Sequence, residues 1–279
     1  MRSHRKSRAL AGALAVAGAC AAMALPQSAT AAPIVFFGLD NANFSANPAG
    51  APNTAAARSA FVTAVGAASI VTETYESAAS GFLPNNFAGT LVNGVGVTVT
   101  HDAPNIVNGN DSNYLRITDG PGGFNTYATG GTRFVEAVRG QGNTYFVATF
   151  DQGVQAIGFD ITDVSDWIGN VDPVPPLEAV FTTVSNASVV LSLTQGLDPR
   201  TLNDGNIAFF GVFDALDPFT SFSIRSSANA PAGDAFGLDN VMIGLRAAAV
   251  PEPGTLALIG GVLSVLALAR RRKVVASAA

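Results

Sequence analysis

The stretch Ile157-Gly158-Phe159-Asp160-Ile161 decides the fold class, because its large apolar side chains alternate with glycine and aspartate. This alternation is typical of a half-buried β-strand, in which successive side chains point to opposite faces of a sheet. Similar short apolar runs recur along the chain, separated by Gly, Asn, Asp and Pro, the residues of turns. Their even spacing predicts an all-β protein with a β-sandwich or jelly-roll architecture.

The predicted strands share a short length and a content of β-branched and aromatic residues. They are residues 34–38, 70–75, 95–100, 114–117, 145–150, 156–161, 179–184, 189–194, 207–213, 219–225 and 236–245. One short helix near the N-terminal side is predicted over residues 53–65, where Phe61 and Val65 lie on an apolar face. Asn53 or Thr54 is expected to cap it.

Composition excludes several classes of protein. Of the 279 residues, 48% are hydrophobic and 13% are charged, which argues against a disordered chain and against a coiled coil. The net charge of −5 argues against a nucleic-acid partner, because nucleic-acid binders present clustered positive charge to the phosphates.

Residues 1–31 have the pattern of a secretory signal peptide. Four basic residues within the first eight precede an apolar run over residues 9–25, and Ala29-Thr30-Ala31 supplies the small-residue cleavage site. We expect a signal peptidase to cleave after Ala31, which leaves a β-sandwich ectodomain over residues 32–249. A retained membrane anchor is the alternative, but the Ala-rich run and the cleavage sequence favour removal.

Residues 250–279 combine three features. Pro251, Glu252 and Pro253 form a stiff, non-helical tether, because each proline fixes φ and lacks an N–H donor. Residues 255–269 carry no charge and rise about 22 Å as a helix, which suffices to span a bilayer if the flanking basic side chains snorkel. We predict a transmembrane helix, which is followed at once by Arg270, Arg271, Arg272 and Lys273. This basic cluster would stay cytoplasmic and leave the ectodomain outside.

This order of Pro-Glu-Pro, hydrophobic helix and basic cluster resembles the PEP-CTERM sorting signal. The resemblance implies recognition by an exosortase, a membrane protease-transpeptidase that cuts near the Pro-Glu-Pro and passes the protein toward the cell surface or exopolysaccharide. The inner membrane would then hold the chain only transiently.

The ectodomain also resembles a family of secreted bacterial proteins that carry this signal and whose expected fold is a β-sandwich. The matching blocks are 34–38 with Asp40, 56–61, 72–76, 156–160, 209–211 and 234–241. The closing Leu238-Asp239-Asn240-Val241 is similar to the last strand of jelly-roll carbohydrate-binding modules. In those modules, an Asp there and a Glu on an early strand often hold a structural Ca²⁺.

Asp239 is the most informative single position. It has the strand phase of Val241 and Ile243, which predicts that it faces the core. A buried carboxylate needs a cation, backbone donors or a raised pKa. Ca²⁺ held together with Glu76, Asp234 or a loop carbonyl would satisfy it. The alternative is that Asp239 lies at a bulge and caps a neighbouring loop.

Residues 32–249 hold seven arginines, no lysine and 19 acidic residues, a net charge of −12. Such a surface favours Ca²⁺ and repels anionic polymers unless divalent cations bridge them. The only cysteine, Cys20, lies in the predicted signal peptide, so the ectodomain forms no disulfide and must be stabilised by its core.

Few residues in the ectodomain have a pattern typical of catalysis. Its only histidine, His101, is expected in an exposed loop, and without a second His or a Cys a zinc site of the usual kind is excluded. Asp160, Asp163 and Asp166 precede Trp167, which would stack on a sugar ring if it lines a loop. Turn chemistry for the aspartates and a core position for the tryptophan are the favoured interpretations.

The sequence therefore predicts a secreted surface or extracellular-matrix protein, processed by an exosortase, associated with exopolysaccharide and not an enzyme. Two alternatives stay open. The first is a Ca²⁺-dependent carbohydrate-binding module for the cell's own exopolysaccharide. The second is a matrix polysaccharide hydrolase, which would need two carboxylates roughly 5–10 Å apart in a concave site.

Overall fold

The computed structural model describes residues 32–45, 47–84, 87–90, 95–101, 114–122, 125–138, 144–164, 177–198, 201–226 and 235–245. The predicted signal peptide and the whole segment 250–279, with its predicted transmembrane helix, lie outside these ranges. Within them, the longest helix has 14 residues, and no helix has the length and apolar character needed to cross a membrane.

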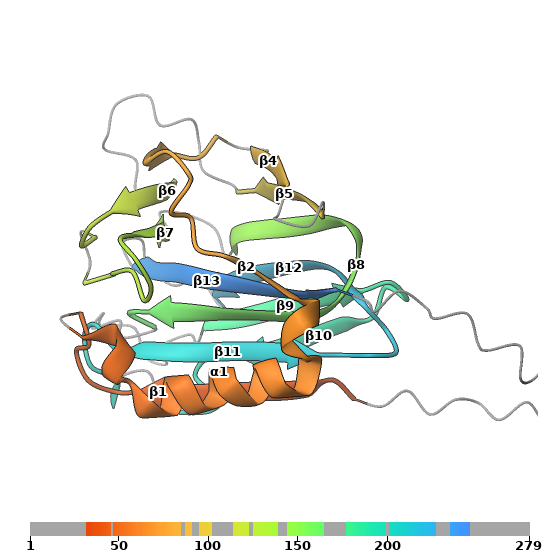
Figure 1. The fold of residues 1–279 in the computed structure, drawn as a ribbon, viewed down its shortest axis with the longest axis horizontal. Coiled ribbons are helices and arrows are strands. Elements are labelled where there is room, and N and C mark those ends of the chain that lie inside the picture. Colours follow the sequence, from red (N-terminus) through yellow and green to blue (C-terminus); the bar gives the residue numbers. More distant parts are fainter. Residues whose placement is uncertain are drawn as a thin grey trace, which may run out of the picture. The chain divides into compact units, whose positions relative to one another are not determined.

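Within these ranges the chain forms 13 β-strands and one α-helix, which confirms the predicted fold class (Figure 1). The elements in chain order are β1 (Ile34–Asp40), α1 (Pro52–Val65), β2 (Ile70–Glu73), β3 (Gly81–Phe82), β4 (Phe87–Thr90), β5 (Gly96–Thr100), β6 (Tyr114–Asp119), β7 (Arg133–Val138), β8 (Thr144–Thr162), β9 (Leu177–Thr183), β10 (Ser188–Ser192), β11 (Ile207–Phe213), β12 (Phe219–Ser226) and β13 (Ala235–Leu245). Single 3₁₀ turns, Pro48–Gly50 and Ala67–Ser69, flank α1.

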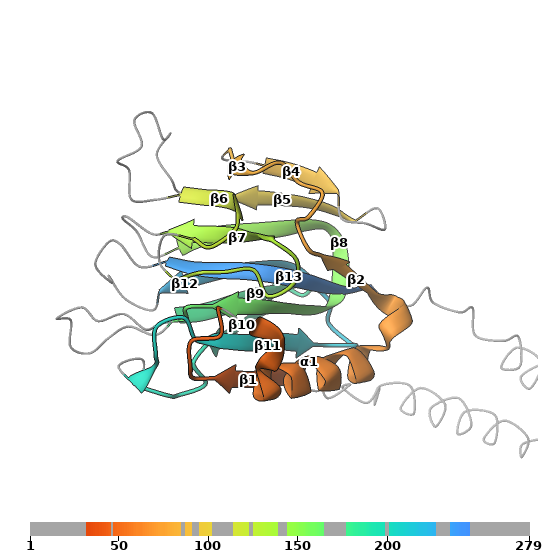
Figure 2. The same cartoon turned by 60° about the vertical axis from the view of Figure 1, so that its left-hand side comes forward.

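Strand β8 belongs to both layers of the sheet structure. Its first part pairs with β12 and β5, and its second part pairs with β13 from Val154 onward and with β11 from Ala156 onward. The strands predicted at 145–150 and 156–161 are therefore one continuous strand. Strand β8 curves from one layer into the other (Figures 1 and 2). Asp151 and Gln152, which resemble turn residues, are exposed and lie between Thr149 and Val154, where the pairing of β8 with β12 is irregular.

All strand pairs are antiparallel. One layer runs β1-β11-β8-β13-β7-β6-β3, with β2 also paired to β13, and the other runs β10-β9-β12-β8-β5-β4. Phenylalanine rings meet between the layers: Phe181 of β9 lies 6.3 Å from Phe210 of β11, and Phe159 of β8 lies 5.9 Å from Phe222 of β12. This shared core is the interior of a β-sandwich.

Strand β7 is absent from the sequence prediction, and its charged residues explain why. Arg133 and Glu136 make the segment look like a loop, because charged residues are rarely buried in a sheet. Glu136 is nevertheless fully buried, and Arg116 on the adjacent strand β6 neutralises it at 2.6 Å. The ion pair between β6 and β7 thus stabilises a strand that the local sequence of residues 133–138 does not predict.

Helix α1 packs on the outer face of the first layer, beside β1 and β11 (Figures 1 and 2). Phe61, fully buried, presses against two glycines of the sheet. A Cβ atom on Gly211 would lie 2.7 Å from the Phe61 ring, and one on Gly158 would lie 3.0 Å from it. Gly158, the glycine of the alternating pattern over residues 157–161, therefore faces α1 and leaves room for the Phe61 ring.

The N-terminus of α1 is capped differently from the prediction. The helix begins at Pro52, and Asp40 at the end of β1 accepts hydrogen bonds from the backbone N–H groups of Asn53 (3.2 Å) and Thr54 (2.8 Å). The carboxylate satisfies donors that have no partner within the helix. The Thr54 hydroxyl instead donates to the carbonyl oxygen of Ile207, so the cap ties α1 to both β1 and β11.

Replacing Gly211 with alanine should destabilise the fold by about 1–3 kcal/mol, because the added methyl group overpacks the Phe61 ring. The effect is measured as the change in free energy of unfolding by denaturant. The substitution Phe61→Leu is the matched background: Gly211→Ala should cost less there, because the ring that clashes is gone. Equal costs in both backgrounds would show that the ring contact does not set the requirement for glycine.

Candidate functional site

Asp239 lies at a β-bulge, and this corrects the predicted direction of its side chain. The register of β13 against β8 shifts between Asp239 and Met242, and Asn240 has a φ of 48°. Because of the extra residue, Leu238, Val241 and Ile243 all contribute to the core between the layers. The prediction that Asp239 shares a face with Val241 and Ile243 is therefore wrong, although the side chain is 1% exposed, as a core position requires.

Asp239 holds the loop that leads into β7, here called the 125–132 loop after its residues. Its carboxylate accepts hydrogen bonds from the backbone N–H groups of Thr129 (2.8 Å), Gly130 (2.9 Å) and Asn240 (2.7 Å). Burial raises the pKa of Asp239 to about 6, and these N–H donors oppose the rise because they stabilise the charged form. The alternative that the sequence left open, a bulge carboxylate that caps a loop, describes this geometry.

Glu76 holds the other end of the same loop. Its Oε1 atom accepts hydrogen bonds from the backbone N–H groups of Thr132 (2.8 Å) and Arg133 (2.7 Å), which lower the pKa of Glu76 below its ordinary value. Gly131, directly before Thr132, has a φ of +76°, and a Cβ atom there would lie 2.4 Å from the Glu76 carboxylate. Glu76 and Asp239 therefore both anchor the 125–132 loop.

Asp160 forms a buried ion pair with the helix. The Arg58 guanidinium of α1 lies 2.6 Å from the fully buried Asp160 carboxylate, which also accepts hydrogen bonds from the Thr129 hydroxyl (2.7 Å) and the Asn240 amide (2.9 Å). The Thr129 hydroxyl lies 3.1 Å from Asp239 as well, so the two carboxylates share one neighbour. This network joins α1, β8, β13 and the loop.

Glu136 holds the start of the 125–132 loop in the same manner. It accepts hydrogen bonds from the hydroxyl groups of Thr126 (2.8 Å) and Tyr114 (3.1 Å), in addition to its ion pair with Arg116. Sequence reasoning did not single out Glu136. The signal available was the opposite charge of Arg116, which becomes a cross-strand neighbour only once the β6–β7 register is known.

One oxygen of each carboxylate, Asp239 Oδ2 and Glu76 Oε1, already accepts two backbone hydrogen bonds from the loop. A Ca²⁺ ion at either of these two oxygens would have to displace N–H donors. Within the described ranges, no three His, Cys, Asp or Glu side chains are grouped as metal ligands. Asp234, the third predicted ligand, lies outside the described residues.

The remaining predicted residues are placed as follows. Trp167 and Asp166 lie outside the described residues. Asp163 accepts a hydrogen bond from the backbone N–H of Gly205 at 2.8 Å, a contact between two segments far apart in the sequence. His101 is buried rather than exposed as predicted. Its Nε2 atom lies 3.1 Å from the carbonyl oxygen of Leu83, a contact between the end of β5 and the segment after β3.

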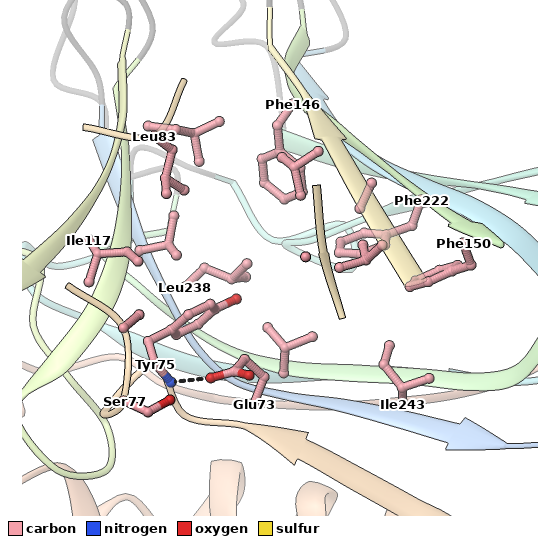
Figure 3. Close-up of a pocket in the computed structure, with 18 residues that line it drawn as sticks. Glu73, Tyr75, Ser77, Leu83, Ile117, Phe146, Phe150, Phe222, Leu238 and Ile243 are labelled. Carbon is pink, nitrogen blue, oxygen red and sulfur yellow. Dashed lines mark hydrogen bonds between the residues drawn. The ribbon is translucent and has the colours of Figure 1, made fainter. Parts of the chain in front are cut away.

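A cavity of about 190 Å³ lies between the two layers, where β4 and β5 face β6, β7 and β13 (Figure 3). Its walls are almost entirely apolar, and they include the rings of Phe146, Phe150 and Phe222. The polar groups Glu73 and Tyr75 lie along one side. Residues from many separate segments build this cavity, so no local sequence pattern indicates it.

The ion pair of Arg58 with Asp160 should contribute to the free energy of unfolding. Replacing Arg58 with alanine leaves a buried carboxylate without its cation and should lower the free energy of unfolding by on the order of 3 kcal/mol. The control is Arg225→Ala, which removes the more exposed pair with Glu178 and should cost about 1 kcal/mol or less. Denaturant unfolding of the two variants measures the difference, and equal losses would contradict the special role of Asp160.

The comparisons with known proteins bear on the C-terminal segment. The PEP-CTERM protein-sorting motif matches residues 249–273, the segment that carries Pro251, Glu252 and Pro253 and ends with the basic cluster. No curated protein matches the chain. Among solved structures, the K2 cleaved adhesin domain of Lys-gingipain is similar over 64% of this chain and 99% of that chain, with a TM-score of 0.38 and 11% sequence identity. At that TM-score the likeness carries no functional argument.

The match confirms the sorting signal that the sequence predicts. The motif implies processing by an exosortase and indicates export and sorting. The chain is therefore a protein with a PEP-CTERM sorting motif and a mostly β ectodomain, exported to the cell surface or the extracellular space.

Proposed function

We propose that the ectodomain is a non-enzymatic component of the extracellular matrix, associated with exopolysaccharide after an exosortase has released it from its membrane helix. The sorting motif at residues 249–273 is the observation that carries this proposal, since it directs the chain outward. The buried carboxylates support the non-enzymatic part. Asp160, Asp239 and Glu136 each form contacts with arginine or with loop donors that join elements of the fold.

The charges of the ectodomain support a cation-mediated association. Each arginine that the structure describes in the ectodomain is paired with an acid: Arg58, Arg116, Arg133 and Arg225. These guanidinium groups therefore already interact with carboxylates of the same chain. The net charge of residues 32–249 is −12. An anionic exopolysaccharide would be repelled unless divalent cations lie between the two surfaces. The association should therefore weaken when divalent cations are removed.

Replacing Pro251, Glu252 and Pro253 with alanines should leave the protein unprocessed in the inner membrane, because the sequence that the exosortase recognises is gone. Cell fractionation and mass spectrometry of the C-terminus of the mature protein measure the outcome. The wild type should be released with a shortened C-terminus and should sediment with the exopolysaccharide.

The matched control replaces Val274, Val275 and Ser277 with alanines, three changes close to the motif but beyond residues 249–273. This variant should be processed like the wild type. Normal release of the Pro-Glu-Pro variant would refute sorting by this signal. Correct processing without any sedimentation with exopolysaccharide would refute the matrix association alone.

A second candidate is a Ca²⁺-dependent carbohydrate-binding module, which the excess of acidic groups favours. Because Asp239 and Glu76 are satisfied by loop N–H groups, we expect EDTA to leave the melting temperature of the protein unchanged. A melting temperature lowered by EDTA and restored by added Ca²⁺ would instead support the calcium site. Glycan binding that is lost in Trp167→Ala would support the carbohydrate-binding role, whatever the metal.

A further inference from the structure

The cavity between the layers has the size of a site for one small apolar molecule. Its volume of about 190 Å³ exceeds that of an engineered cavity of about 150 Å³ that binds benzene in another protein. It therefore has room for a single six-membered ring with a small substituent. Phe146, Phe150 and Phe222 line one wall, and Ile117, Leu238 and Ile243 line the other (Figure 3).

One side of this cavity is polar. Glu73 at the end of β2 and Tyr75 just beyond it both line the cavity (Figure 3). The backbone N–H of Tyr75 donates to the Glu73 Oε1 atom at 2.7 Å, and the Tyr75 carbonyl oxygen accepts a hydrogen bond from Ala78 at 2.9 Å. These two contacts fix the backbone of Tyr75 on both sides of its side chain.

Tyr75 adopts a backbone conformation that is costly for its residue type. Its φ is 60°, in the left-handed region that bulky side chains rarely occupy. Strain of this kind persists where the surrounding structure enforces it, and it is common at binding sites. In this protein, the strained turn keeps the tyrosine ring against the cavity instead of in solvent.

The polar groups on this side retain unused hydrogen-bonding capacity. The Tyr75 hydroxyl forms no hydrogen bond to any residue that the structure describes, and neither does the Glu73 Oε2 atom. Burial, together with the negative charges of Glu73 and Asp239, raises the pKa of Tyr75 far above its ordinary value, so the hydroxyl keeps its proton. The cavity thus offers one donor and one negatively charged acceptor beside apolar walls.

We propose that this cavity binds a small, uncharged apolar molecule of about one ring that carries a single hydroxyl group. The ligand hydroxyl accepts a hydrogen bond from the Tyr75 hydroxyl and donates one to the Glu73 carboxylate, which satisfies both groups. A ligand with a carboxylate is disfavoured, because Glu73 repels it. Ser77 in the 75–78 turn both lines the cavity and is exposed to solvent, so this wall of the cavity reaches the protein surface.

The test uses the purified exported protein with p-cresol as the probe and toluene as the matched molecule without the hydroxyl. We expect saturable binding of p-cresol with a dissociation constant in the millimolar range or below, measured by calorimetry, and at least threefold weaker binding of toluene. Benzoate should not bind. Absence of saturable p-cresol binding would overturn the proposal, and equal affinities for p-cresol and toluene would overturn the role of the hydroxyl.

Two variants locate the binding. Ala148→Leu fills the cavity from the wall formed by β8 and should abolish binding of both molecules. Tyr75→Phe keeps the ring and removes the donor, so it should lower the affinity for p-cresol to that for toluene. A denaturation curve for each variant establishes that it is folded. If Ala148→Leu does not fold, Tyr75→Phe decides: unchanged p-cresol affinity in that variant would refute binding through the Tyr75 hydroxyl.

Discussion

The passage of β8 through both layers is the constraint on which the rest of the structure depends. One strand pairs with β12 and β5 at its start and with β11 and β13 at its end, so the two layers are joined by covalent chain as well as by packing. The pairing of β8 with β12 is irregular between Thr149 and Val154, the stretch that holds Asp151 and Gln152. Phenylalanine rings of β8, β9, β11 and β12 meet between the layers that β8 joins. The cavity lies where the layers are lined by smaller residues as well, such as Ala148 and Gly89.

Several of the carboxylates that the structure describes serve as structural hydrogen-bond acceptors. Asp40 caps α1, Asp160 binds the helix through Arg58, and Asp239 and Glu76 anchor the 125–132 loop. Backbone N–H groups and guanidinium groups supply the donors that a buried charge requires. Acidic residues in a sequence of this kind therefore indicate neither a catalytic pair nor a metal site until their partners are known.

Local sequence was sufficient for the strands whose pattern is self-contained. The run Ile207–Phe213 was predicted with its observed bounds, because it is apolar and bordered by turn residues. Strand β7 was missed because the neutralisation of Glu136 depends on Arg116 of another strand. The direction of Asp239 was wrong because a bulge at Asn240 changes the phase of β13, and a single sequence carries no mark of it. The sequence does not predict the cavity, because the residues that line it come from separate elements. The sorting signal was predicted from its motif alone, since Pro-Glu-Pro, apolar run and basic cluster are contiguous in the chain.

The phenylalanine contacts between the layers have a chemical consequence. Residues 32–249 contain no cysteine, so the two layers are held by ring packing and strand pairing and never by sulfur bridges. Folding outside the cytoplasm therefore requires neither an oxidant nor a disulfide isomerase. The covalent structure of the ectodomain therefore does not change with the thiol–disulfide potential of its surroundings.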